Sequence, residues 1–139
     1  MIDVEYGTSK EGLPVFRATF YPNTHICLEP LAPVRSATYP VIIGLDAGLT
    51  PAAVLMQQTP TGRVLILDEV YTPKGESSGM ERFLQVKLLP LLRSKYADCT
   101  FLVVVDPASM QRSQATEETV YDIVTKARLK VIPGPTQDI

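Results

Sequence analysis

Two aspartates, each at the end of an apolar run, are the residues of this chain best placed to do chemistry. Asp46 follows the run at residues 41–45, and Asp106 follows the run at residues 101–105. Short runs this apolar predict buried strands. A carboxylate at the mouth of a buried strand is costly to desolvate unless something pairs with it. Each aspartate therefore either caps a turn through its own backbone or holds a cation or a substrate.

The elements between the two aspartates decide whether they meet. A predicted helix separates the two apolar strands, which implies a right-handed crossover and a partly parallel sheet. If the strands pair side by side, Asp46 and Asp106 emerge together at the carboxyl ends of their strands. Open α/β sheets bind their ligands at that edge.

A pair of adjacent aspartates suits a divalent cation, because the two carboxylates repel each other unless a cation lies between them. Hard oxygen ligands select Mg²⁺ or Mn²⁺ over zinc or copper. Two such ions about 4 Å apart are a common machinery for hydrolysing phosphodiesters. The alternative is that both acids cap turns where the sheet ends, and spacing alone leaves both interpretations open.

The remaining pattern predicts an α/β fold in which helices flank a mixed sheet. Three strand-like runs separated by short turns indicate an antiparallel meander, and a helix, a strand, a second helix and a last strand follow. We expect Pro90 to kink or split the first helix, and Thr116 to cap the second. An irregular opening of about 40 residues contains one possible strand at residues 15–21. The expected elements are strands at 41–45, 52–57, 63–71, 101–105 and 129–132, and helices at 80–96 and 116–128.

Composition limits the class of protein to which these motifs belong. The chain has 139 residues, of which 45% are hydrophobic and 20% charged, as in a globular domain. No apolar run approaches the roughly 20 residues of a membrane span. The net charge of -2 lacks the basic excess typical of nucleic-acid binding and counts mildly against it. Two cysteines and one histidine are too few for a disulfide framework or a zinc site, which favours a reducing, cytosolic compartment.

Three segments carry a resemblance to a known family. They are G-L-D-A-G-L-T-P-A-A at residues 44–53, G-R-V-L-I-L-D-E at 62–69 and V-V-D-P-A at 104–108. Together they resemble the nuclease domain of the large terminase subunit of tailed bacteriophages. The lead-in G-L-P-V-F at 12–16, followed by His25, is similar to the segment that joins the packaging ATPase of that family to its nuclease. The resemblance covers nearly the whole chain.

The resemblance implies an RNase H-like fold and a metal-dependent endonuclease that cuts concatemeric double-stranded phage DNA during packaging. Asp46 and Asp106 match the first and second acids of the family, which are catalytic and bind Mg²⁺ or Mn²⁺. Residues 1–38 would be a lead-in that follows an ATPase domain absent from this chain, and residues 39–139 the nuclease core. The implied partners are double-stranded DNA, the ATPase domain in cis, the portal and the small terminase subunit, in the host cell cytoplasm and without a membrane.

The family also needs a third acid further along the chain. The sequence ends at residue 139, and Asp138 lies too early to take that role. We therefore expect a C-terminally incomplete nuclease core whose apolar sheet surface is exposed. With two carboxylates and no third ligand, we expect weak metal binding and weak or absent cleavage.

Four further residues are secondary candidates with a simpler alternative each. Glu69 could lean toward the metals, although one acid of the pair Asp68-Glu69 is expected to face solvent and the other to cap a turn. Thr50 could form a hydrogen bond with Asp46 and so support it as a metal ligand, or it could simply begin the turn. Lys74 and Arg112 could contact DNA phosphates, whereas loop cations are more commonly solvated.

Two other functions fit parts of the same pattern. The chain could be a non-catalytic fragment that docks DNA or a packaging protein. Sugar kinases and actin-like ATPases share the strand followed by D-x-G-T, which holds ATP phosphates. Here the order is D-A-G-L-T-P at residues 46–51, with an inserted residue and an added proline, and the chain is too short for two such domains.

Overall fold

The computed structural model describes residues 19–48, 50–73, 76, 79–107 and 118–135. It divides the chain into two compact units, residues 1–30 and 31–139. The described part of the first unit contains one short helix, α1 (Pro22–His25). Pro22 stands at the start of this helix, where its missing N–H costs no hydrogen bond. Phe20 and Tyr21 do not form the strand expected at residues 15–21, and residues 15–18 lie outside the described part.

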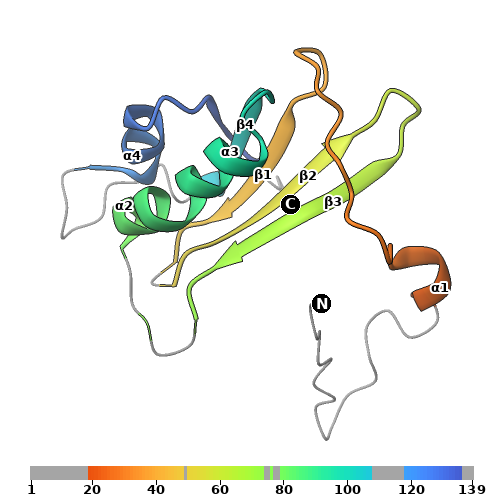
Figure 1. Cartoon of the computed structure of the whole chain (residues 1–139). Helices are drawn as coiled ribbons and strands as arrows, with labels where there is room; N and C mark the ends of the chain where they lie inside the picture. Colours follow the sequence, from red (N-terminus) through yellow and green to blue (C-terminus); the bar gives the residue numbers. More distant parts are fainter. Residues whose placement is uncertain (1–18, 49, 74–75, 77–78, 108–117, 136–139) are drawn as a thin grey trace, which may run out of the picture. The chain divides into compact units, whose positions relative to one another are not determined.

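The second unit is built on one five-stranded mixed sheet with the order β3-β2-β1-β4-β5 (Figure 1). Strands β1, β2 and β3 form the expected antiparallel meander, and β4 and β5 continue the sheet in parallel from β1. The chain therefore has the α/β fold with a mixed sheet and helices that the sequence predicted, and this arrangement is consistent with the RNase H-like fold that the resemblance implies. The strands are β1 (Val41–Asp46), β2 (Ala52–Gln58), β3 (Val64–Tyr71), β4 (Phe101–Val105) and β5 (Val131–Pro133).

The helices of this unit lie over one face of the sheet, which we call the covered face (Figure 1). Both crossovers, from β3 to β4 and from β4 to β5, progress in the same direction across the sheet, so right-handed connections place their helices on the same side. The helical segments are α2 (Met80–Phe83), η1 (Leu84–Leu88), α3 (Leu89–Lys95) and α4 (Val120–Lys126).

The core lies between these helices and the covered face. Alternate residues of the central strands are fully buried there, including Ile43 of β1 and Val103 of β4. The helices contribute Phe83, Leu88 and Val124, which are at most 1% exposed. Burying an aliphatic or phenyl side chain of this size stabilises the fold by about 1.5–3 kcal/mol, so this single layer supplies most of the driving force.

Pro90 changes the helix that the sequence predicted at residues 80–96. The segment is helical nearly throughout, but residues 84–88 form a π-helix, in which the N–H of Leu89 donates to the carbonyl of Leu84. Proline has no N–H and its ring crowds the preceding turn, so a wider turn just before it relieves the clash. The helix is not split at Pro90, because α2, the π-turn and α3 follow one another without a gap.

A β-bulge in β3 changes which residues share a face. Leu55 pairs with Asp68, but the next residue of β2, Met56, pairs with Ile66, so Leu67 is an extra residue in β3. One extra residue reverses the alternation beyond it. Ile66 therefore faces away from the helices before the bulge, and Glu69 does so after it, whereas Asp68 faces the covered side.

A buried glutamine ties residues 31–40 to the sheet. The side chain of Gln57 is fully buried in β2. Its Nε2 donates to the carbonyls of Val34 (2.8 Å) and Tyr39 (2.7 Å), and its Oε1 accepts from the N–H of Val34 (2.7 Å). Arg35 adds an ion pair with Asp98 at 2.6 Å. Residues 31–38, expected as part of a lead-in, thus belong to the same compact unit as the sheet.

The N-terminus of α4 differs from the expectation. The cap is Thr119, not Thr116, and the Thr119 side chain accepts from the N–H of Asp122 while the Asp122 carboxylate accepts from the N–H of Thr119. This reciprocal pair is a capping box with aspartate in place of glutamate. Thr116 lies outside the described residues. Among the helices that are described, none has the length and apolar character needed to cross a membrane.

Candidate functional site

Asp46 and Asp106 lie side by side at the carboxyl ends of two neighbouring parallel strands. Leu45 of β1 pairs with Val105 of β4, and each aspartate is the next residue in its strand direction. Adjacent strands are roughly 4.8 Å apart. Both side chains are exposed and lie on the face opposite the helices, because Leu45 and Val105 before them are buried on the covered side. The juxtaposition expected from the crossover is therefore present.

Asp46 also stabilises the turn that follows it. Its Oδ1 accepts a hydrogen bond from the N–H of Gly48 at 3.2 Å. This is the turn-capping role that the sequence left open. It occupies one carboxylate oxygen only, and a carboxylate has acceptor sites on both oxygens. Turn capping and cation binding at Asp46 are thus compatible.

The two aspartates border an open depression of about 810 Å³ on the same face. Its floor is Gly44, and a Cβ built there would meet no heavy atom within 4 Å. Val54 of β2 and Val104 of β4 pair with Gly44 from either side and form the walls. Sequence reasoning did not identify Gly44, although a glycine inside an otherwise apolar strand can indicate close approach of another molecule.

Glu69 and Asp68 have opposite roles because of the bulge. Glu69 pairs with Val54 and so lies on the same face as Asp46, but two strands away. From strand spacing and rise, its Cα is roughly 12 Å from that of Asp46, too far for one cation to be shared. The sequence predicted that one acid of the pair Asp68-Glu69 would face solvent and the other would cap a turn. Asp68 does neither. Its Oδ2 accepts from Lys95 Nζ (2.8 Å) and Tyr96 OH (3.1 Å) on the covered side.

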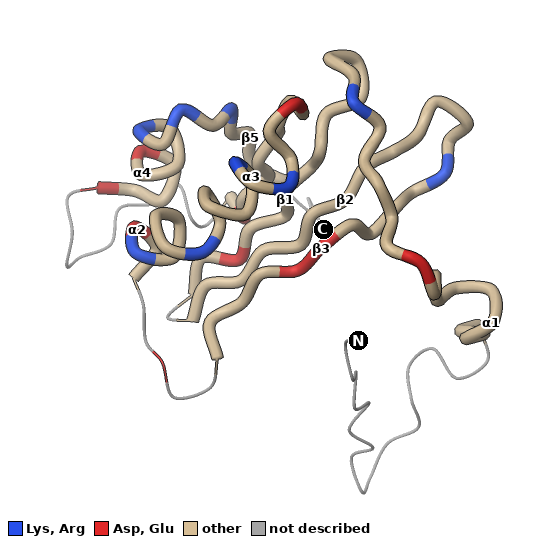
Figure 2. The backbone as a smooth tube through the Cα atoms, in the orientation of Figure 1, with Lys and Arg blue, Asp and Glu red and all other residues tan. Residues whose placement is uncertain are grey.

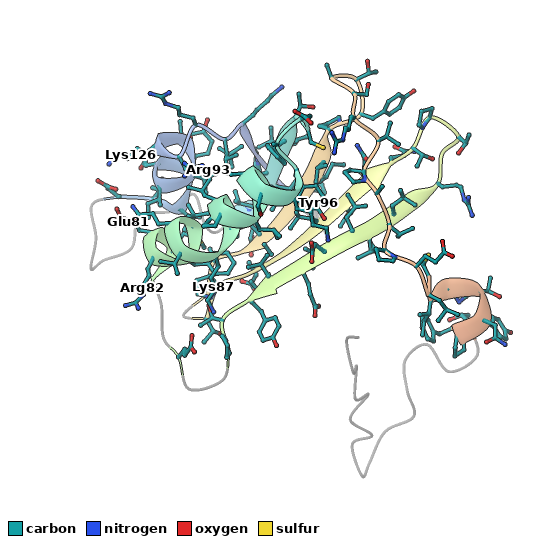
Figure 3. The ribbon with its side chains drawn as sticks, viewed as in Figure 1. Glu81, Arg82, Lys87, Arg93, Tyr96 and Lys126 are labelled. Atoms are coloured by element: carbon teal, nitrogen blue, oxygen red, sulfur yellow. The ribbon has the colours of Figure 1, made fainter. Side chains whose placement is uncertain are left out.

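Tyr96 is buried between α3 and the sheet (Figure 3). Burial, and then the adjacent carboxylate of Asp68, raise the pKa of Tyr96 well above its ordinary value of 10.0. The phenol therefore stays protonated and donates to Asp68. This polar group holds the helix layer to β3 and lies on the face away from the candidate site.

The other candidate residues are not brought to the aspartate pair. Thr50 is exposed. Thr50 and Asp46 both belong to the described part of the chain, and no hydrogen bond joins them. Lys74 and Arg112 lie outside the described residues. His25 belongs to the first unit, where its Nδ1 accepts from the N–H of Tyr21 at 2.8 Å.

Charge is distributed unevenly over the two sides of the sheet. Lys and Arg gather on α2, α3 and α4 and on the loops around them (Figure 2). The described strand residues of the opposite face include Asp46 and Glu69 but no lysine or arginine. A phosphate placed near Asp46 and Asp106 would therefore need a cation to offset the acidic charge.

The aspartate pair fits a divalent cation in its chemistry and spacing. Oxygen ligands of octahedral Mg²⁺ lie 2.0–2.1 Å from the ion, so two that share it are about 3–4 Å apart, and neighbouring strands allow this. Mg²⁺ is commonly held by one or two carboxylates together with water or substrate phosphates. Within the described part of the chain, no group of three His, Cys, Asp or Glu side chains is arranged to hold a metal. The pair alone would bind weakly.

Comparisons of this chain with protein-family models, with curated proteins and with solved structures find no match.

Proposed function

We propose that this chain is the nuclease core of a phage terminase large subunit, a metal-dependent endonuclease acting on double-stranded DNA. The observation that carries the proposal is the register of β1 and β4, which sets Asp46 and Asp106 side by side at the ligand-binding edge of the sheet. The three sequence segments that resemble the family support the same assignment. An ATPase domain in cis, the portal and the small terminase subunit are the partners that this proposal entails.

Divalent ions held at this edge would lower the pKa of an attacking water and stabilise the leaving oxygen of a phosphodiester. The chain contributes the two carboxylates that orient the ions. It also contributes the Gly48 N–H, which holds Oδ1 of Asp46 in place. With only this pair, we propose an affinity for Mg²⁺ or Mn²⁺ of about millimolar, at the weak end of oxygen-ligand sites. Cleavage by the 139-residue chain would accordingly be slow.

Metal binding is tested first, because it does not require activity. Titration of the ¹⁵N-labelled chain with Mn²⁺ should broaden the amide resonances of residues 44–48 and 104–107 first, at about millimolar ion. The variants Asp46→Asn and Asp106→Asn should lose this broadening. Asp98→Asn is the matched control, since Asp98 is exposed and pairs with Arg35 away from the site.

DNA cleavage is tested on the same proteins. Linear double-stranded DNA incubated with Mn²⁺ should be cut slowly by the parent chain and by Asp98→Asn, and not by either site variant. Broadening that is centred elsewhere, or that survives in Asp46→Asn, would refute the assignment of the metal site. Cleavage unchanged in Asp106→Asn would refute the catalytic role.

A further inference from the structure

Thr72, the residue that follows β3, is a polar residue buried in the described part of the chain, with 7% of its surface exposed. Its N–H (3.2 Å) and its hydroxyl (3.1 Å) both donate to the carbonyl of Pro51. A backbone carbonyl has two lone pairs, so one residue fills both acceptor sites of this oxygen. Pro51 is itself fully buried. Thr72 therefore fixes the backbone at Pro51.

Pro51 is the last residue of the turn between β1 and β2. Strand β1 ends at Asp46, β2 begins at Ala52, and these two residues form the last pair between the strands. Residues 47–51 connect them. Proline fixes its own φ and restricts the conformation of the residue before it. A turn whose last residue is a buried, doubly bonded proline has few conformations left.

The first half of the same turn holds the carboxylate of Asp46. The N–H of Gly48 donates to Oδ1 of Asp46 at 3.2 Å. A Cβ built at Gly48 would lie 3.7 Å from the same oxygen, so the backbone of the turn is in contact with the carboxylate. The orientation of this carboxylate therefore depends on the conformation of the turn.

The helix layer holds the strand end from which Thr72 acts. Lys87 of η1, labelled in Figure 3, donates from Nζ to the carbonyl of Tyr71 at 3.1 Å and pairs with Glu76 at 3.5 Å. Tyr71 directly precedes Thr72. Single π-turns within helices often occur near functional sites. The helix layer, β3 and the β1–β2 turn are thus joined by successive hydrogen bonds that end at Asp46.

We propose that Thr72 is a positioning residue for Asp46, because its hydroxyl holds Pro51 and the turn so held orients the Asp46 carboxylate through the N–H of Gly48. Without the hydroxyl, the turn adopts more conformations and fewer molecules hold the carboxylate in place. The apparent affinity for a ligand falls with the fraction of molecules in the binding conformation. The consequence for divalent cations rests on the proposed function.

Two substitutions of Thr72 separate its hydroxyl from its packing. Thr72→Val keeps the shape and the N–H but removes the hydroxyl, whereas Thr72→Ser keeps the hydroxyl and removes a methyl group. Exchange of the Gly48 amide with water, measured by NMR without metal, reports the conformation of the turn. We expect exchange to be about threefold to tenfold faster in Thr72→Val, as for the loss of one hydrogen bond, and to stay within about twofold of the parent in Thr72→Ser.

Mn²⁺ titration of the same proteins tests the effect on the site. The Mn²⁺ concentration that half-broadens residues 44–48 and 104–107 should rise about twofold or more in Thr72→Val, and not in Thr72→Ser. Thr100→Val is the matched control, because the hydroxyl of Thr100 also donates to a carbonyl, that of Ser36 at 3.4 Å. Thr100 is exposed and precedes β4, at the end of that strand away from Asp106. It should leave both measurements unchanged.

Four results would overturn the proposal. They are unchanged Gly48 exchange in Thr72→Val, an equal change in Thr72→Ser, equal Mn²⁺ affinity of the parent and Thr72→Val when the parent binds Mn²⁺, and loss of protection of the Val103 amide in Thr72→Val. The Val103 N–H donates to the carbonyl of Lys130 within the sheet, so its loss would mean that the hydroxyl holds the whole sheet and not the turn. The parent chain decides the proposed function separately. If Mn²⁺ leaves its site resonances unchanged, the metal site is refuted, and Gly48 exchange still decides whether Thr72 positions Asp46.

Discussion

Replacing Gln57 by leucine should destabilise the sheet unit by about 2–3 kcal/mol. Leucine has a similar volume, so the substitution keeps the packing and removes three hydrogen bonds to the backbone of Val34 and Tyr39. A net hydrogen bond contributes about 0.5–1.5 kcal/mol, which gives about 3 kcal/mol for three.

Two effects adjust this figure in opposite directions. The added apolar burial of leucine raises the free energy of unfolding of the variant by about 1 kcal/mol. The N–H and carbonyl of Val34 and the carbonyl of Tyr39 lose their partner, and an unsatisfied buried group costs about 1–3 kcal/mol. Val34 and Tyr39 are only half-buried, so water reaches part of these groups and limits the second effect.

The assay is urea-induced unfolding followed by circular dichroism, together with hydrogen exchange of the Val34 amide. Gln58→Leu is the matched control, since Gln58 is the next residue and is exposed on the face opposite the helices. We expect Gln58→Leu to lie within about 0.5 kcal/mol of the parent. Exchange of the Val34 amide should become faster only in Gln57→Leu. If the two variants unfold alike, or if the Val34 amide keeps its protection, Gln57 does not hold residues 31–40 to the sheet.

Two further predictions concern Tyr96 and Arg128. The raised pKa of Tyr96 means that the folded state keeps a proton that the unfolded chain releases above its ordinary pKa of 10.0, so stability should fall as pH rises past that value. Tyr96→Phe should lower the free energy of unfolding by about 1 kcal/mol at pH 7, because the hydrogen bond to Asp68 is lost. Above pH 10, the free energy of unfolding measured in urea should fall less steeply in this variant than in the parent chain. A parallel decline in both proteins would contradict this. Arg128 follows the C-cap of α4, Ala127, and has a φ of 61°, so Arg128→Gly should raise the unfolding free energy by about 0.5–1 kcal/mol, whereas Arg128→Ala, which keeps the strained backbone, should not. Equal effects of glycine and alanine would show that charge, not backbone strain, matters there.

Most strands could be predicted because the signals that specify them are local. The apolar run before Asp106 coincides with β4, and β1 extends only one residue beyond its expected end. Turn residues between the first three strands indicated a meander, and the helix between β3 and β4 indicated a parallel β4. Where competing local signals lie close together, prediction failed: Thr116 and Thr119 both precede the helix, and only the reciprocal bonds with Asp122 distinguish the true cap.

The bulge at Leu67 explains the main error in assigning roles near the site. Strict alternation along β3 cannot be extended across an extra residue. The sequence therefore did not show that Asp68 lies on the covered face and Glu69 on the opposite face. The contact of Asp68 with Lys95 and Tyr96 joins residues nearly thirty positions apart. Such long-range contacts leave no periodic trace in the sequence.

The sequence by itself determined the strand ends that carry Asp46 and Asp106 and, through the preference for right-handed crossovers, their placement at one edge of the sheet. Only the tertiary structure decided what surrounds them. It placed the helices on one face because both crossovers run in the same direction, and so left the aspartates on the opposite face beside the depression at Gly44. Strand formation follows local patterns of burial and turns, whereas the pairing of faces depends on the whole set of connections.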